Sequence, residues 1–84
     1  MMKKSFYIGS CPVCGQGMLE LVKENKSGSL FVLCDECEGE WESPEHALSE
    51  YQGSRGKYGA VSKVTLQEIQ VIHWDRFLLQ DDPL

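Results

Sequence analysis

The spacing of four cysteines constrains this chain more than any other feature. Cys11 and Cys14 enclose two residues, Cys34 and Cys37 enclose two more, and 19 residues separate the pairs. Two intervening residues let a tight turn aim both sulfurs at one ion, and this is the pattern of a tetrahedral zinc site. A chain of 84 residues buries only a modest apolar core, so a metal would supply much of its stability.

Disulfide bonds and an iron site are two alternatives to zinc for these thiols. Disulfides require an oxidising compartment, whereas an iron site of the rubredoxin type uses the same four thiolates and is not distinguished by the sequence. Residues 1–14 contain two lysines but no long apolar stretch or small-residue cleavage site. No segment approaches the roughly 18 apolar residues of a membrane span. We therefore expect a cytoplasmic protein without membrane contact, whose reduced thiols hold zinc.

Around these cysteines the chain resembles the zinc-ribbon superfamily, over about residues 8 to 43. The resemblance implies that Cys11, Cys14, Cys34 and Cys37 bind one zinc ion. A site closed by four protein thiolates keeps no open position for water or substrate, so this zinc would be structural. Its binding energy, of order 10–16 kcal/mol, would then be folding energy. The motif is a specific signal for a metal site, but it does not identify a function.

The segment between the cysteine pairs suits a β-hairpin, with residues 18–24 running out and residues 30–34 returning. Gly15, directly after the first pair, can leave its turn with a positive φ at little cost. Glu38 holds that place after the second pair and makes it the less regular turn. Residues 38–43 predict a third short strand, with Trp41 turned inward. The expected ribbon is antiparallel, with two to three strands.

One short helix is expected after the ribbon. Ser43 and Pro44 are typical of an N-cap and first helical residue, for a helix over 44–51. Residues 52–63, with three glycines, are interpreted as a loop. The predicted fold class is thus a single small α+β domain over 1–84, with a zinc ribbon over 8–43 and a helical part over 44–84.

A capping box at residues 65–68 predicts a C-terminal helix over 66–80. Its apolar residues form two stripes, a wider surface than one face of a helix on a small ribbon requires. Either the helix breaks near His73 and folds its end back, or some of the surface around Trp74 and Phe77 meets a partner. A bent helix that covers the sheet is the favoured alternative.

Catalytic chemistry is not expected. His46 and His73 are interpreted as ordinary surface or half-buried residues, because four cysteines already complete the metal site. Glu38, Glu40 and Glu42 alternate along the predicted strand and would share one solvated face rather than form an acid–base pair. No glycine-rich phosphate loop precedes a helix. We predict that the protein is not an enzyme and takes no small-molecule substrate.

Acidic residues are concentrated around the second cysteine pair. Residues 34–51 contain seven acids and no lysine or arginine, against a net charge of −5 for the whole chain, so the remainder is +2. Solubility alone is one interpretation. The other is a basic protein partner, which an acidic face attracts at a distance. The residues predicted to bind it are Asp35, Glu36, Glu38, Glu40, Glu42, Trp74 and Phe77.

The favoured function is therefore a non-catalytic zinc-binding module for protein interaction. In one version it is an inhibitor or immunity protein, whose acids occupy the phosphate-binding cleft of a nuclease-type toxin. The alternative is a transcription- or translation-associated ribbon that binds nucleic acid. Its contacts would be Arg55, Lys57, Tyr58 and Lys63, which make a small basic footprint with one aromatic ring for stacking.

Overall fold

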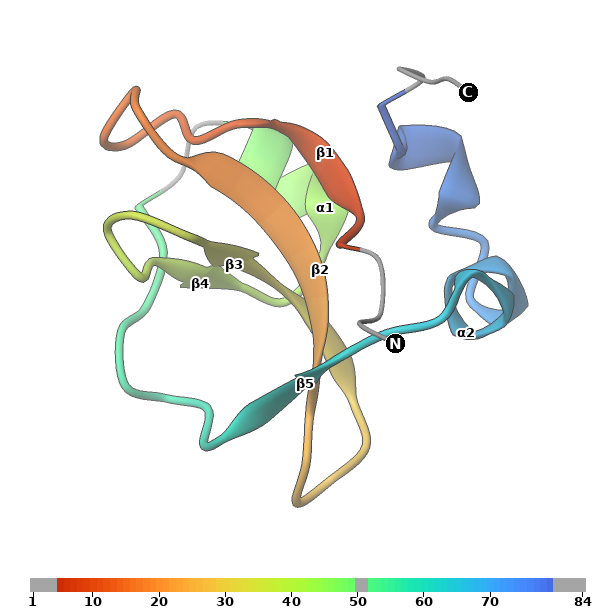
Figure 1. Cartoon of the computed structure of the whole chain (residues 1–84). Coiled ribbons are helices and arrows are strands. Elements are labelled where there is room, and N and C mark those ends of the chain that lie inside the picture. The colour runs from red at the N-terminus through yellow and green to blue at the C-terminus, as the bar shows by residue number, and fades with distance from the viewer. Residues whose placement is uncertain (1–4, 50–51, 80–84) are drawn as a thin grey trace.

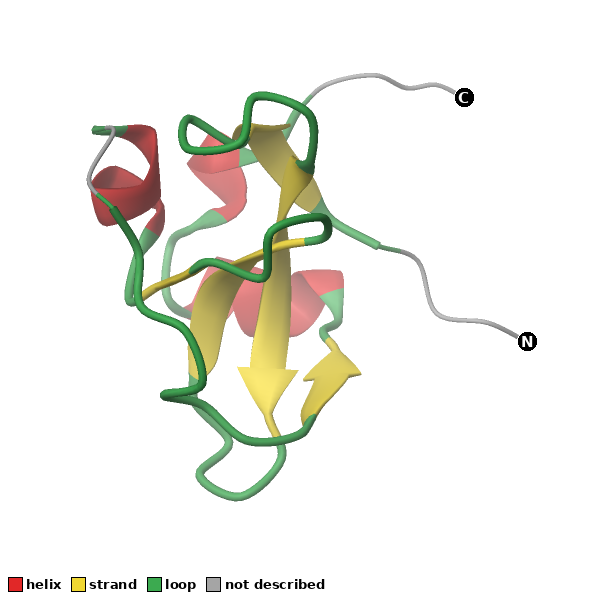
Figure 2. Ribbon diagram, turned by 90° about the vertical axis from the view of Figure 1, so that its left-hand side faces the viewer, coloured by secondary structure: helices red, strands yellow, loops and turns green. Residues whose placement is uncertain are grey.

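The strand β2 organises an antiparallel sheet in the computed structural model, which describes residues 5–49 and 52–79 (Figure 1). The sheet has five strands, joined by two short α-helices and a 3-10 turn, η1, in a small α+β arrangement. Figure 2 shows the strands in the centre with the helical segments around them. The elements are β1 Tyr7–Ser10, β2 Met18–Glu24, β3 Leu30–Cys34, β4 Glu40–Trp41, α1 Pro44–Leu48, β5 Val61–Lys63, α2 Leu66–Val71 and η1 Asp75–Phe77.

The hairpin of β2 and β3 has the bounds predicted from the sequence. The two strands pair in antiparallel register from Leu19 opposite Cys34 to Lys23 opposite Leu30. The third predicted strand is β4, which is shorter than expected and pairs with the outer edge of β3. Trp41 is buried, as expected from its inward orientation. The run of Leu, Val and Phe in the hairpin explains its stability, since such residues pack well on a pleated surface.

The other edge of β2 is shared by two strands that the sequence did not reveal. β1 pairs with the first part of β2, with Ser10 opposite Met18. β5 pairs with the last part, with Val61 opposite Glu24, although residues 52–63 were expected to form only a loop. The two strands lie end to end along one edge. β5 has three residues, too few to show an alternating pattern.

The short helix α1 begins as predicted. The side chain of Ser43 accepts a hydrogen bond from the His46 N–H, and Pro44 is the first helical residue. Pro44 and Ala47 are buried, and the helix packs against β3 and β4. It ends at Leu48, and the last predicted positions, 50 and 51, lie outside the described residues.

The C-terminal helix breaks near His73, which is one of the two arrangements that its apolar surface predicted. Thr65 and Glu68 form the expected capping box, but α2 ends at Val71. The N–H of Trp74 donates to Ile69 O at 3.1 Å and the N–H of His73 to Gln70 O at 3.0 Å. With the φ of His73 at +63°, these two bonds make a Schellman motif. A residue in this conformation cannot continue a right-handed helix.

A core of buried residues lies between the sheet and the helical segments. It includes two of the cysteines, and Trp74 and Phe77 are half-buried against it. The buried members are Ile8, Cys11, Leu19, Leu21, Val32, Cys34, Trp41, Ala47, Val64 and Ile69. The folded-back end after α2 therefore helps to cover the sheet. Within the described ranges, no helix is long and apolar enough to cross a membrane.

Candidate metal centre and the surfaces around it

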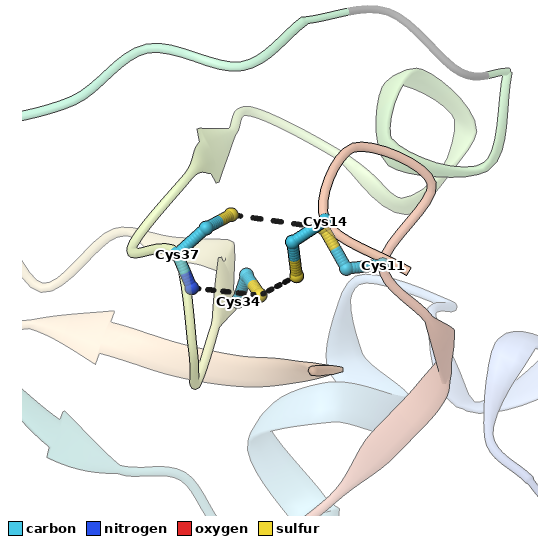
Figure 3. Close-up of side chains that lie close together, drawn as sticks. All are labelled: Cys11, Cys14, Cys34 and Cys37. Atoms are coloured by element: carbon cyan, nitrogen blue, oxygen red, sulfur yellow. Dashed lines mark hydrogen bonds between the residues drawn. The ribbon is translucent and has the colours of Figure 1, made fainter. Parts of the chain in front are cut away.

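The four cysteine sulfurs converge on one point between two loops (Figure 3). All four lie within 4.8 Å of one another, with Cys11 and Cys37 Sγ atoms 3.8 Å apart and those of Cys14 and Cys34 3.7 Å apart. Zinc–sulfur bonds of about 2.3 Å in a tetrahedron place sulfurs about 3.8 Å apart. Disulfide-bonded sulfurs lie about 2 Å apart, and all four cysteines are free. The thiols therefore fit one tetrahedral metal ion.

The first loop of the centre, residues 11–17, is called the first knuckle. The N–H of Cys11 donates to Gly17 O at 2.8 Å, and the N–H of Gly15 donates to Cys11 O at 3.0 Å. Gly15 has a φ of +70°, as the sequence predicted. Gly17 donates its N–H to Cys14 Sγ, and a Cβ at Gly17 would lie 2.6 Å from Cys34 Sγ. Glycine is therefore needed where the first knuckle contacts the second.

The second loop, residues 34–39, is called the second knuckle. The N–H of Cys34 donates to Gly39 O at 2.9 Å, and the N–H groups of Glu36 and Cys37 both lie 3.4 Å from Cys34 Sγ. Glu38 follows the second cysteine with a φ of +62°. It takes the same left-handed conformation as Gly15 in the first knuckle, so the less regular turn predicted from Glu38 is not seen in the backbone at this position.

The environments of the thiols differ in burial and in hydrogen bonding. Burial raises the pKa of Cys34 to about 12. Hydrogen bonds from the backbone N–H groups of Gln16 and Gly17 lower the pKa of Cys14 to about 6. A thiol buried like Cys34 stays protonated at neutral pH unless a metal ion replaces the proton. Soft thiolate ligands in a tetrahedral set select zinc or iron.

A segment after α1 folds over the second knuckle and is called the strap, residues 52–59. The carboxylate of Glu40 anchors it by accepting hydrogen bonds from Ser54 Oγ at 3.0 Å, Lys57 N at 3.0 Å and Tyr58 N at 3.4 Å. Glu40 is only 6% exposed. The prediction that Glu40 shares a solvated face with Glu38 is therefore wrong. The strap supplies the donors that satisfy its buried carboxylate, and sequence periodicity does not show them.

The basic side chains proposed as nucleic-acid contacts each lie against an oxygen atom of the protein itself. The contacts are Arg55 Nε to Cys37 O at 2.9 Å, Lys57 Nζ to Glu42 at 3.5 Å, and Lys63 Nζ to Glu20 at 2.8 Å and to Ser5 Oγ at 2.6 Å. These residues do not converge on one uncompensated basic surface. Glu42 and Glu20 partly neutralise the charges of Lys57 and Lys63, whereas Arg55 bonds a neutral carbonyl oxygen.

Tyr58, proposed as a stacking platform for a base, already stacks on an aromatic ring of the protein. Its ring lies 3.8 Å from that of Phe31, with 9° between the planes. One face of Tyr58 is therefore covered, and the side chain fixes the strap to β3. Lys57 Nζ lies 5.5 Å from the centre of the same ring.

The acids of the second knuckle face solvent. Asp35 accepts a hydrogen bond from the Met18 N–H at 2.9 Å but is exposed. The side chains of Glu36 and Glu38 are exposed, and neither forms an ion pair with any residue in the described part of the chain. Glu42 is also exposed and lies near Lys57. Three of the predicted partner-binding acids thus lie together on one loop.

The apolar residues proposed for partner binding are less exposed than their neighbours. Trp74 and Phe77 are half-buried against the core, and Arg76 lies over the Phe77 ring at 4.6 Å. Val71 is 71% exposed and Ile72 38% exposed. These two residues belong to the apolar surface of the predicted helix but were not among the residues predicted to bind a partner.

The two histidines lie apart from the sulfur cluster. His46 Nδ1 is 2.8 Å from Ser43 Oγ at the start of α1, and His73 follows the end of α2. Among the described residues, the cluster that can hold a metal ion consists of the four cysteines alone.

No family model, curated protein or solved structure matches this chain. The class of site therefore follows from its own geometry. It is a centre of four cysteine thiols, compatible with a zinc-binding module.

Proposed function

We propose that the protein is a non-catalytic binding module of the zinc-ribbon type, stabilised by one zinc ion held by Cys11, Cys14, Cys34 and Cys37. Sulfur separations of 3.7 and 3.8 Å support a tetrahedral site. Four protein ligands close the coordination shell, so the ion supports the fold rather than a reaction. Iron in the same thiolates would give coloured protein. Colourless protein with one zinc per chain is the expected result of metal analysis.

The surface that binds the partner is the exposed acidic edge of the second knuckle. Four thiolates and one Zn²⁺ carry a formal charge of −2, and Asp35, Glu36 and Glu38 bring the total to about −5. Such a concentration of charge attracts a basic protein and speeds its association. Glu40 is removed from this surface because it is buried beneath the strap.

One observation favours a protein over a nucleic acid as the partner. The basic side chains of the strap and β5 contact the protein's own oxygen atoms, whereas Glu36 and Glu38 have no charged partner among the described residues. A phosphate backbone needs free lysine or arginine near its oxygens. The second knuckle repels phosphate and attracts cations.

The test compares two variants that each remove two negative charges. Glu36→Gln/Glu38→Gln removes two negative charges from the second knuckle, and Glu45→Gln/Asp75→Asn removes two from α1 and η1, outside both knuckles. Each tagged protein is incubated with lysate of its native host, and the eluate is analysed for protein and nucleic acid as salt increases.

The expected result is a stoichiometric basic protein that elutes as salt increases. The knuckle variant should associate with it about tenfold more slowly at low salt, and the control variant at nearly the wild-type rate. A nuclease as the captured protein would support the narrower role of inhibitor. Nucleic acid without a protein partner, or equal rates for both variants, would contradict the proposed surface.

A further inference from the structure

We propose that Arg55 is a positioning residue of the metal centre, which fixes the second knuckle and offsets part of the thiolate charge. Retention of the metal ion would then depend on the strap. This inference rests on the proposed zinc site, but it is independent of the identity of any binding partner.

Arg55 contacts a residue that supplies a metal ligand. Its Nε donates to the backbone oxygen of Cys37 at 2.9 Å, from a position 18 residues further along the chain. The bond holds the carbonyl of the ligand residue itself, so it restrains the turn that aims the Cys37 sulfur. Groups that orient metal ligands in this way commonly affect metal affinity by 10- to 100-fold.

The strap holds Arg55 in place from both sides. Before it, Ser54 and Glu40 exchange two backbone hydrogen bonds of 2.8 and 2.9 Å. After it, the backbone N–H groups of Lys57 and Tyr58 donate to the Glu40 carboxylate. Because these anchors belong to β4, directly after the second knuckle, the arginine is preorganised and loses little freedom when the metal binds.

Charge gives Arg55 a second effect. The metal centre and the acids of the second knuckle carry a formal charge of about −5. Among the described lysines and arginines, Arg55 is the one with a hydrogen bond to a knuckle residue, whereas Lys57 contacts Glu42. The Arg55 charge lies against the backbone of a ligand residue, where it offsets part of this negative charge.

The experiment measures how fast zinc passes from the loaded full-length protein to an excess of a chromophoric chelator. Arg55→Gln removes the charge but keeps an amide donor, and Arg55→Lys keeps the charge but loses the fixed guanidinium geometry. Lys57→Gln is the matched control, because it removes one positive charge from the same strap without touching the knuckle. Its backbone bond to Glu40 is unchanged by the substitution.

Zinc transfer from Arg55→Gln should be about tenfold faster than from the wild type, with Arg55→Lys between them. Transfer from Lys57→Gln should stay within about twofold of the wild type, since its exposed ion pair contributes little. Circular dichroism of each loaded protein before transfer checks that it is folded.

Equal rates for Arg55→Gln and Lys57→Gln would overturn the inference while leaving the zinc site intact. A wild-type protein that binds no stoichiometric metal would overturn both.

Discussion

The two knuckles hold the metal centre with similar backbones and different side chains. Both turn through a left-handed residue directly after the second cysteine, Gly15 in the first knuckle and Glu38 in the second. The closing hydrogen bond of the first runs from Cys11 to Gly17 and encloses one residue more than the bond from Cys34 to Gly39. The first knuckle has no acid, whereas the second has three.

The similar backbones reflect what metal binding requires, whereas the different side chains determine the charge of the exposed surface. The ion needs two sulfurs and a turn that aims them, and both knuckles meet that need. A non-glycine residue in the left-handed region costs roughly 1–2 kcal/mol. The second knuckle tolerates this cost at Glu38, where the side chain adds negative charge to the exposed edge. Glu38 therefore strains the turn of the second knuckle but adds charge to the surface proposed to bind a partner.

The largest expected effect is common to both knuckles. Cys14→Ser and Cys37→Ser each remove one ligand, and each should lose zinc and unfold. The binding energy of order 10–16 kcal/mol is as large as the whole stability of a typical domain. Far-ultraviolet circular dichroism and zinc analysis measure the loss, and chelation of the wild-type protein should reproduce it. If one variant stayed folded without metal, the knuckles would not be equivalent supports.

A smaller effect should appear where the knuckles touch. Gly17→Ala places a Cβ 2.6 Å from Cys34 Sγ and 2.8 Å from Glu36 Cβ, so the free energy of unfolding should fall by about 1–3 kcal/mol. The control, Gly59→Ala, should change it by no more than about 0.5 kcal/mol, because its Cβ meets only the Glu24 carboxylate at 3.9 Å. Denaturant titration in excess zinc measures both. Equal losses would show that the two loops are not in contact.

Substitutions at the two left-handed residues, Gly15 and Glu38, should change the stability of the protein in opposite directions. Gly15→Ala should destabilise the protein by about 1 kcal/mol, since its Cβ would meet no neighbour and only the backbone is strained. Glu38→Gly should stabilise it by a similar amount, about 1 kcal/mol, by relieving the same strain. Thermal denaturation of both zinc-loaded proteins gives the two values. A stabilising Gly15→Ala would mean that the first knuckle does not need its left-handed residue.

The smallest expected effect concerns the ion pair of Lys23 and Glu68, which lies outside both knuckles. A hydrogen bond from Lys23 at 2.6 Å lowers the pKa of Glu68 to about 2, with help from the Thr65 N–H. A lowered pKa stabilises the fold at pH values above the ordinary pKa of Glu, and this stability is lost as pH falls from about 4.5 toward 2. Glu68→Gln should therefore be less stable than the wild type at pH 7.

The gap in melting temperature between Glu68→Gln and the wild type should narrow once the pH is below about 4.5. Thermal melts in excess zinc between pH 7 and 4 measure it, with Gly59→Ala as a control whose gap stays constant. A gap that persisted to pH 4 without narrowing would contradict the lowered pKa of Glu68.

Local signals predicted a large part of this fold. The β2–β3 hairpin, the N-cap Ser43 and the capping box of α2 each depend on neighbouring residues, and the structure has all three. The cysteine spacing predicted a cluster that the structure also has. These features could be predicted because their physical causes act over a few residues or through one well-defined ligand geometry.

The features that could not be predicted depend on contacts between distant segments. Glu40 is buried because strap residues 14 to 18 positions later donate to its carboxylate. The end of α2 could be given only as one of two alternatives, because His73, rather than glycine, takes the left-handed position of a Schellman motif. β5 becomes a strand only because the free edge of β2 lies beside it.

The shared edge of β2 has a consequence for the integrity of the chain. β1 comes from the start of the sequence and β5 from a segment after α1, yet both pair with the same strand. A single backbone cut between α1 and β5 would leave two fragments whose strands still belong to one sheet. The shorter fragment, with β5 and α2, would bind the longer one as a separate peptide adds a strand to a sheet edge. Mixing the two pieces should therefore rebuild the parent molecule without a covalent link.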